Sequence, residues 1–536
     1  QAFYAPLFDM LKSNNDKDPY LRQAAVMGLV RSDHNPLSLV YEWKQAKAKY
    51  DIPAVRMGVL LALRKHHSDK VAEFLADEEP RIVAEAARAV YDERMLTLRT
   101  RGLFPVLAQL AEKSGQPDAV AYRALSANFW LGTDEAARRV ATFAARSTEP
   151  DHTRAFALKL LGDWSKPPRR DPITGITMAL PERDARIAAT AIHGVGGAIF
   201  AGSDVVRRQA SQVVAKLGLK EFGPAMAAMV KDASQPINLR VEALFAVDAL
   251  RDDRTKDLVA FAMESNEPKL RAAGMTVKAR LEPNAVIRTL PALLNDGKVS
   301  LAEKQAAFAI LASAGPSEAA DRLLDEWLDA ALAKKVPQEL VLDVLDAAES
   351  RAKTPRIKLF APLKAKVDRY RGAQVVRSDD KLAPFLESLA GGDAEKGRNI
   401  FLNNSAVYCQ RCHKLDGQGG EVGPALNGIA ADKEKDRRYL LESIALPSAK
   451  IAKGFETVIL VLEDERTISG IIKSEDKTSI KLVTAENKEI VVPVKDVAAR
   501  RGGPSAMPDD LHKKLSRREL RDVVEFLASL KEPGKR

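Results

Sequence analysis

The chain has 536 residues, of which 46% are hydrophobic and 29% charged, and its formal net charge at pH 7 is +10. This length predicts roughly three to four domain equivalents, with enough apolar residues for soluble cores. No apolar run approaches the ~18 residues of a membrane span, and a total of two cysteines excludes a disulfide framework.

Residues 1–355 are predicted to form short amphipathic helices that repeat. Predicted helix starts at positions 204, 236, 268 and 300 advance by 32 residues, and each is followed by a basic residue. Neither helix of such a pair can bury its apolar face alone, so neighbouring pairs must stack, as in a HEAT-like α-solenoid. Five prolines start helices and are followed at three or four residues by arginine: Pro19, Pro53, Pro150, Pro236 and Pro268, with Arg22, Arg56, Arg154, Arg240 and Arg271.

Two stretches depart from this pattern. Residues 166–201 contain four prolines and several glycines, which predicts a longer loop or an irregular repeat. The repeats are predicted to end near Arg351, and residues 356–390 are predicted to be a linker or helical connection. We expect a second domain at residues 391–536.

This second domain is predicted to begin with a short helix. Asp393 is its expected N-cap, and Gly397 and Phe401 follow inside the helix. Glycine costs a helix about 1 kcal/mol relative to alanine. We therefore expect Gly397 to mark a close approach of another helix.

Cys409, Cys412 and His413 form a CxxCH sequence, the attachment motif of c-type haem. If the motif starts a helix, both sulfurs lie on neighbouring turns and reach the haem vinyl groups, while the imidazole ligates the iron. A zinc site and a thioredoxin-like dithiol are the alternatives. Adjacent Cys412 and His413 can rarely bind one tetrahedral ion, and the dithiol reading lacks a βαβ context. We expect one covalent haem c.

Two further residues are predicted to complete the iron site. The carbonyl of Pro424 is placed to accept the Nδ1 proton of His413 and fix its tautomer. The second axial ligand is predicted to be Met507, which lies in a proline-flanked loop, with His512 as the alternative. A methionine that only fills a core gap is the other interpretation of Met507.

Between the two predicted ligands, residues 456–494 change from helical to alternating periodicity. Four short apolar runs separated by charged turns predict a small antiparallel β-meander. Such an insertion could wall off one haem edge, dock a partner or act as a spacer. A final helix is predicted after Ser516, which forms a capping box with Glu519.

These motifs give residues 391–536 a resemblance to a known family, the Pirellula/Verrucomicrobium-type CxxCH haem-binding domain, with a fold similar to cytochrome c. The resemblance implies a mainly α protein in which an all-α cytochrome c-like domain, with its β insertion, follows HEAT-like repeats. The matching segments are Gly392–Asp393 with Gly397 and Phe401, Cys409–His413, Gly423–Leu426, Ser443–Ile444 with Pro447–Ser448, and Ser505–Pro508.

In that family the repeats commonly follow a β-propeller similar to sorbosone- or PQQ-type dehydrogenases. No propeller-like stretch occurs here, and the chain starts at Gln1 without a signal peptide, so we expect a processed or truncated C-terminal portion. The resemblance implies the electron-transfer arm of a periplasmic or otherwise extracytoplasmic dehydrogenase of sugars or alcohols. Its implied partner is a redox protein or a propeller-type dehydrogenase domain.

The sequence also bears on other classes of function. The positive charge is dispersed, and c-type haem is attached after export, so no nucleic-acid partner is expected. Membrane association is expected only through partners. A structural or interaction solenoid whose haem is a redox sensor or stabilising element is the alternative function. No substrate-oxidising site is visible in the sequence, which leaves enzymatic activity undecided.

Overall fold

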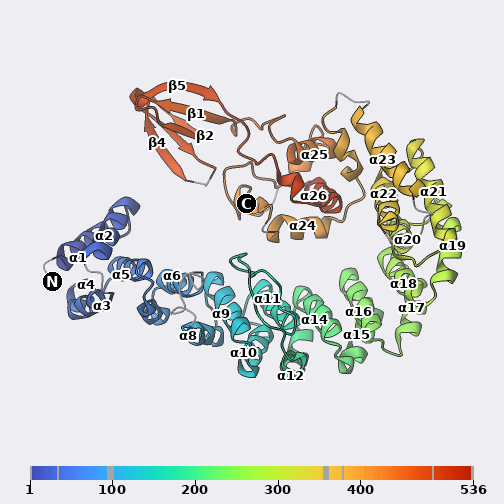
Figure 1. The fold of residues 1–536 in the computed structure, drawn as a ribbon, viewed down its shortest axis with the longest axis horizontal. Helices are drawn as coiled ribbons and strands as arrows, with labels where there is room; N and C mark the ends of the chain where they lie inside the picture. Colours follow the sequence, from blue (N-terminus) through green and yellow to red (C-terminus); the bar gives the residue numbers. More distant parts are fainter. Residues whose placement is uncertain are drawn as a thin grey trace. The chain divides into compact units, whose positions relative to one another are not determined.

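The computed structural model describes residues 3–32, 36–92, 102–353, 361–376, 380–404, 406–485 and 488–532. Its contacts divide the chain into two compact units, Gln1–Gly274 and Met275–Arg536. The described residues are mostly helical, with one small antiparallel sheet in the second unit (Figure 1). This confirms the predicted mainly α fold with a β insertion. Residues 356–360 and 377–379 of the predicted connecting region lie outside the described residues.

The first unit consists of short helices in two layers (Figure 1). In one layer each helix packs against the next, so that apolar faces are buried between neighbours. This layer contains α2 (Pro19–Ser32), α5 (Pro53–Lys65), α6 (Pro80–Tyr91), α9 (Asp118–Leu131), α11 (Asp151–Gly162), α14 (Asp204–Leu217) and α16 (Ile237–Ala249). The remaining helices are α1 (Tyr4–Asn14), α3 (Pro36–Gln45), α4 (Lys47–Tyr50), α8 (Phe104–Gln109), α10 (Asp134–Ala145), α12 (Ala185–His193), α13 (Gly196–Phe200), α15 (Gly223–Lys231) and α17 (Thr255–Met263), with α18 (Pro268–Leu281) crossing the boundary at residue 274.

The predicted 32-residue phase of helix starts is confirmed. Helix α14 begins at Asp204, and α18 begins at Pro268. Pro236 is the N-cap of α16, and Ser300 is the N-cap of α20 (Leu301–Ser313), where it forms a capping box. The regular spacing supports a repeat architecture, and its assignment to the HEAT-like class stays a prediction.

Two of the five recurrent arginines, Arg154 and Arg240, have a structural role that the sequence did not reveal. In α11 the Nε of Arg154 donates to the carbonyl of Ala144 at 2.9 Å, and in α16 the Nε of Arg240 donates to the carbonyl of Val230 at 2.9 Å. Both carbonyls belong to the last turn of the preceding helix, where backbone acceptors lack intrahelical partners. In each pair, the buried guanidinium of the second helix therefore caps the C-terminal end of the first helix. Its positive charge also complements the negative end of the first helix's dipole.

The predicted irregular stretch is confirmed as a loop from 163 to 184, followed by the short helices α12 and α13. Asp171 is 2% exposed and anchors this loop. Its carboxylate accepts hydrogen bonds from the hydroxyl of Tyr91 at 2.5 Å and from the indole of Trp130 at 3.3 Å. It also accepts from the backbone of Ile173 and Thr174 within the loop. One buried carboxylate thus joins the loop to helices α6 and α9.

The second unit begins with helices that continue the paired arrangement and ends with a more irregular domain (yellow to red in Figure 1). No helix of the described residues combines the length and hydrophobicity that a bilayer span requires. The helices of the second unit are α19 (Pro283–Asn295), α20, α21 (Glu318–Leu332), α22 (Gln338–Ala352), α23 (Ala361–Val376), α24 (Ala394–Asn403), α25 (Arg437–Ala445) and α26 (Arg517–Ser529). Its 3-10 turns are η5 (Ala383–Ser388), η6 (Cys409–Arg411), η7 (Ile429–Ala431), η8 (Val494–Asp496) and η9 (Leu511–Lys513).

Helices α24 and α26 pack closely, as Gly397 predicts. A side chain at Gly397 would collide with the backbone carbonyl of Asp522 in α26. Asp393 caps α24 by accepting from the backbone N–H groups of Glu395 and Lys396, and Ser516 forms the predicted capping box at the start of α26. Both helix starts and their contact could therefore be predicted from local sequence signals.

The inserted sheet has five antiparallel strands in the order β4-β3-β2-β1-β5. Four strands form the predicted meander. The prediction missed β5, which follows residue 494 and pairs with the free edge of β1, because its Ala-Ala-Arg-Arg sequence shows no alternation. The strands are β1 (Thr457–Leu462), β2 (Thr467–Glu475), β3 (Ser479–Val483), β4 (Glu489–Pro493) and β5 (Val497–Gly502).

Candidate haem-binding site

The CxxCH motif forms a single tight turn. Cys409 starts the 3-10 turn η6, and the N–H groups of Cys412 and His413 both donate to the carbonyl of Cys409, at 3.2 and 3.1 Å. The motif therefore starts a short 3-10 turn and not an α-helix. The preceding residue, Tyr408, adopts a left-handed conformation with φ 46°, which sets the direction of the turn. The turn places both cysteines and the histidine along one cleft.

Both cysteines have free thiols and are half-buried. Burial raises the pKa of Cys409 to about 11 and also raises that of Cys412. The sulfurs therefore face the cleft as uncharged thiols at neutral pH. The His, Cys, Asp and Glu side chains in the described ranges form no group of three that could hold a metal ion.

His413 is held by the predicted contact. Its Nδ1 lies 2.8 Å from the carbonyl oxygen of Pro424, so Nδ1 carries the proton and donates it. Burial lowers the pKa of His413, an effect that the Pro424 contact opposes, and the ring is neutral at pH 7. With Nδ1 engaged, the unprotonated Nε2 is the nitrogen available as an iron ligand.

Glycine at position 423 makes this contact possible. A Cβ on Gly423 would lie 2.5 Å from the Cε1 and 2.7 Å from the Nδ1 of His413. The loop folds back on the motif because the N–H of Gly423 donates to the carbonyl of Cys412 at 2.8 Å. The loop backbone is thereby pressed against the imidazole face. The sequence marked Gly423 as a matching residue but did not predict this steric role.

The cleft beside the motif is open to solvent and is lined by residues from position 401 to position 527, an extent that suits a large cofactor better than an ion. Its walls are mainly apolar and come from α24, α25, α26 and the loops between them. Phe401 and Val523 belong to helices that the sequence predicted. Tyr439 and Phe455 also line the cleft, and sequence reasoning missed them because neither lies in a recognisable motif.

The structure distinguishes the two candidates for the second axial ligand. Met507 is half-buried and lines the cleft together with Cys409, Cys412 and His413. His512 does not line the cleft; its ring packs edge-on against Phe385 with centroids 4.9 Å apart. This arrangement supports Met507 over His512, and its ligation of the iron stays a prediction.

The inserted sheet packs beside the motif. Ile471 of β2 and Val483 of β3 form an apolar cluster with Val422, and Cys412 and Ala506 pack against this cluster. The ammonium of Lys473, on β2, donates to the carbonyl of Glu421 at 2.9 Å. The sheet therefore borders the cleft on the side of Cys412.

Residues 394–531 match the family model for Cytochrome c. They form a cytochrome c-like haem-binding domain. The match covers 138 of the 536 residues and includes the CxxCH motif, the sheet and Met507. A comparison with curated proteins finds no match for the chain. The family supports covalent haem c as the cofactor and haem-based electron transfer as the activity of this domain.

The cleft of the cytochrome c-like domain fits a haem. It combines two thiols at CxxCH spacing, a neutral histidine with an oriented ring, a thioether and apolar walls. These are the groups that attach the porphyrin and ligate its iron from both faces.

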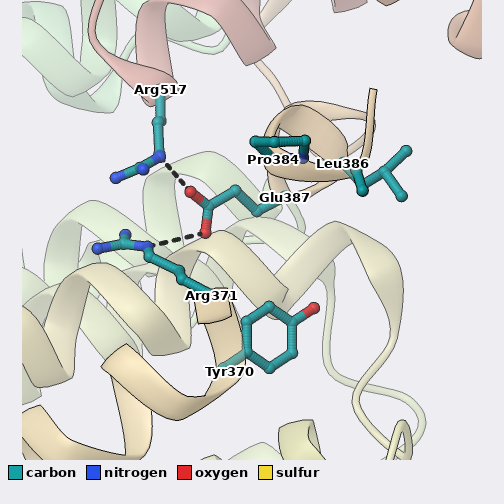
Figure 2. Close-up of a pocket in the computed structure, with 7 residues that line it drawn as sticks. Tyr370, Arg371, Pro384, Leu386, Glu387 and Arg517 are labelled. Carbon is teal, nitrogen blue, oxygen red and sulfur yellow. Dashed lines mark ion pairs between the residues drawn. The ribbon is translucent and has the colours of Figure 1, made fainter. Parts of the chain in front are cut away.

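A second, smaller pocket lies at the start of α26, away from the motif, and contains a buried carboxylate. Figure 2 shows Glu387 between the guanidinium groups of Arg371, in α23, and Arg517, in α26. The Nε of Arg371 lies 3.5 Å from Glu387 Oε2. Burial raises the pKa of Glu387, while the two arginines oppose this shift. The pocket is a structural junction between α23 and the last helix of the cytochrome c-like domain.

Proposed function

We propose that this protein transfers single electrons through one haem c, attached covalently to Cys409 and Cys412. His413 and Met507 are the proposed axial ligands. The observation that carries the proposal is the convergence of both thiols, an oriented neutral imidazole and a thioether on one apolar cleft. The bound haem supplies a reversible one-electron couple.

The residues of the cleft set the reduction potential of this one-electron couple. The carbonyl of Pro424 holds the Nδ1 proton of His413 and makes Nε2 a better electron donor to the iron. A thioether ligand raises the reduction potential relative to a second histidine. The mainly apolar walls provide few groups to solvate charge, which disfavours the more highly charged oxidised iron.

We further propose that the protein is the electron-transfer arm of an extracytoplasmic dehydrogenase that oxidises sugars or alcohols. The resemblance of residues 391–536 to haem domains that accompany propeller-type dehydrogenases supports this role. Filled axial positions leave the iron no place for substrate, so the oxidised molecule binds to a partner. The helical repeats act as the scaffold that joins the haem domain to this partner.

A redox titration with a carbon monoxide control tests the proposed function. We expect a single one-electron transition in the visible spectrum of the full chain. We also expect no spectral change when the reduced protein is exposed to carbon monoxide, because both axial positions are occupied. Rapid carbon monoxide binding at neutral pH would show an open iron site and contradict a pure electron-transfer role.

A further inference from the structure

The inserted sheet begins and ends at the haem cleft. Strand β1 begins at Thr457, two residues after Phe455 of the cleft wall, and β5 ends at Gly502, five residues before Met507. The two strands pair antiparallel, with Val458 opposite Gly502. The ladder continues for one more bond, because the N–H of Gly503 donates to the carbonyl of Thr457 at 2.8 Å. The loop that carries Met507 therefore starts from a fixed point.

One serine from outside the sheet holds this loop on both sides of Met507. The Oγ of Ser448, just after α25, accepts a hydrogen bond from the N–H of Ser505 at 3.2 Å. The same hydroxyl donates to Asp509 Oδ1 at 3.4 Å. Within the loop, the Oγ of Ser505 accepts from the N–H of Met507 at 3.2 Å. These contacts define the position of the loop relative to the cleft.

The loop also packs against the sheet. Ala506, which precedes Met507, packs against the cluster of Ile471, Val483 and Val422, as does Cys412. The residue before the proposed distal ligand and a haem-attaching cysteine thus contact the same apolar cluster. A displacement of the sheet would move the Met507 loop relative to the motif.

We propose that Ser448 and the β1–β5 ladder are positioning elements that hold Met507 over the iron. The proposal rests on the proposed function, because it requires Met507 to be the distal ligand. Ser448 does not contact the proposed iron ligands. It acts on Met507 through its hydrogen bonds to the loop backbone and to Asp509. In this proposal the β insertion has a role at the haem site, because the Met507 loop begins directly after β5, close to its contact with Ser448.

The test is the ease with which added imidazole displaces Met507 in the oxidised full chain. Ser448→Ala removes one N–H···O hydrogen bond at 3.2 Å and a longer hydroxyl contact at 3.4 Å, both open to solvent. We therefore expect imidazole to bind about three-fold more tightly than to the unmodified chain. Ser448→Thr keeps the hydroxyl and is expected to restore the unmodified affinity. Ser474→Ala, at an exposed serine of β2, is the matched control and is expected to have no effect.

The outcomes separate this proposal from the proposed function. An unmodified chain without the near-infrared sulfur-to-iron band would overturn both, because Met507 would not be a ligand. If the band is present but imidazole binds Ser448→Ala no more tightly than Ser474→Ala, the positioning role is wrong and methionine ligation stands. Ser505→Ala provides a second variant, expected to shift imidazole affinity in the same direction; an unchanged affinity there also counts against the proposal.

Discussion

Replacing Met507 with alanine is expected to lower the reduction potential of the haem by on the order of 0.1 V or more, within the roughly 0.8 V range that axial ligands span. The thioether stabilises reduced iron, and its loss leaves water or another weak donor on that face. The measurement is a spectroscopic redox titration of the full chain. The near-infrared sulfur-to-iron band should disappear at the same time.

His512→Ala is the control for this prediction. His512 packs against Phe385 and does not line the cleft, so the potential and the near-infrared band should both stay unchanged. If His512→Ala removes the band and Met507→Ala does not, the ligand assignment is wrong. A folded Met507→Ala variant with an unchanged potential would show that Met507 only fills space in the core.

Replacing Asp343 with asparagine is expected to destabilise the second unit by about 3–5 kcal/mol. The side chain of Asp343, in α22, is 1% exposed. Its carboxylate pairs with Arg521 of α26 at 2.7 Å and with Arg518 at 2.9 Å. Asparagine cannot neutralise Arg521, which is 5% exposed, and a buried unpaired guanidinium is strongly unfavourable. The measurement is urea unfolding followed by circular dichroism and by haem absorbance.

Asp346→Asn is the matched control for Asp343. Asp346 pairs with Arg518 at 2.6 Å but is 26% exposed, so water compensates for the lost charge and the cost should stay below about 1 kcal/mol. Equal unfolding midpoints for the two variants would show that the Asp343 pair contributes no more than a surface pair. Replacing Asp343 and Arg521 together with leucine and methionine should recover much of the stability.

This buried pair bears on the domain organisation. The sequence predicted a boundary between repeats ending near residue 355 and a haem domain starting at residue 391. Contacts within the chain group residues 275–536 as one compact unit, and the boundary between residues 355 and 391 stays a prediction. Asp343 and Gln305 belong to the helices before the predicted boundary, yet Asp343 pairs with α26 and Gln305 donates to the carbonyl of Gly391 at 2.7 Å. Whether residues 391–536 fold alone stays a prediction.

Local patterns predicted most of the haem site. The CxxCH spacing and the Gly-Pro contact to His413 each depend on a few neighbouring residues. The glycine at position 397 is a local signal of a close helix contact, although its partner, Asp522, is distant in the sequence. Four of the five strands could also be predicted, because the alternation of apolar and polar residues lies within each strand. These features needed no knowledge of contacts between distant segments.

The features that sequence reasoning missed depend on distant contacts. Ser448 and Asp343 act on residues 57 and 178 positions away, and no periodicity marks either of them. Strand β5 is defined by pairing with β1, since its own sequence lacks alternation. Tyr439 reaches the cleft only because α25 packs beside α26.

The central claim is that the chain carries one haem c, attached through Cys409 and Cys412. The most direct measurement extracts the purified full chain with acid acetone and then records the pyridine haemochrome spectrum and the intact mass of the protein. We expect that the haem stays with the protein, that the mass increases by one haem, and that replacing both cysteines with alanine removes it. A colourless chain, or haem that the solvent extracts completely, would contradict the account.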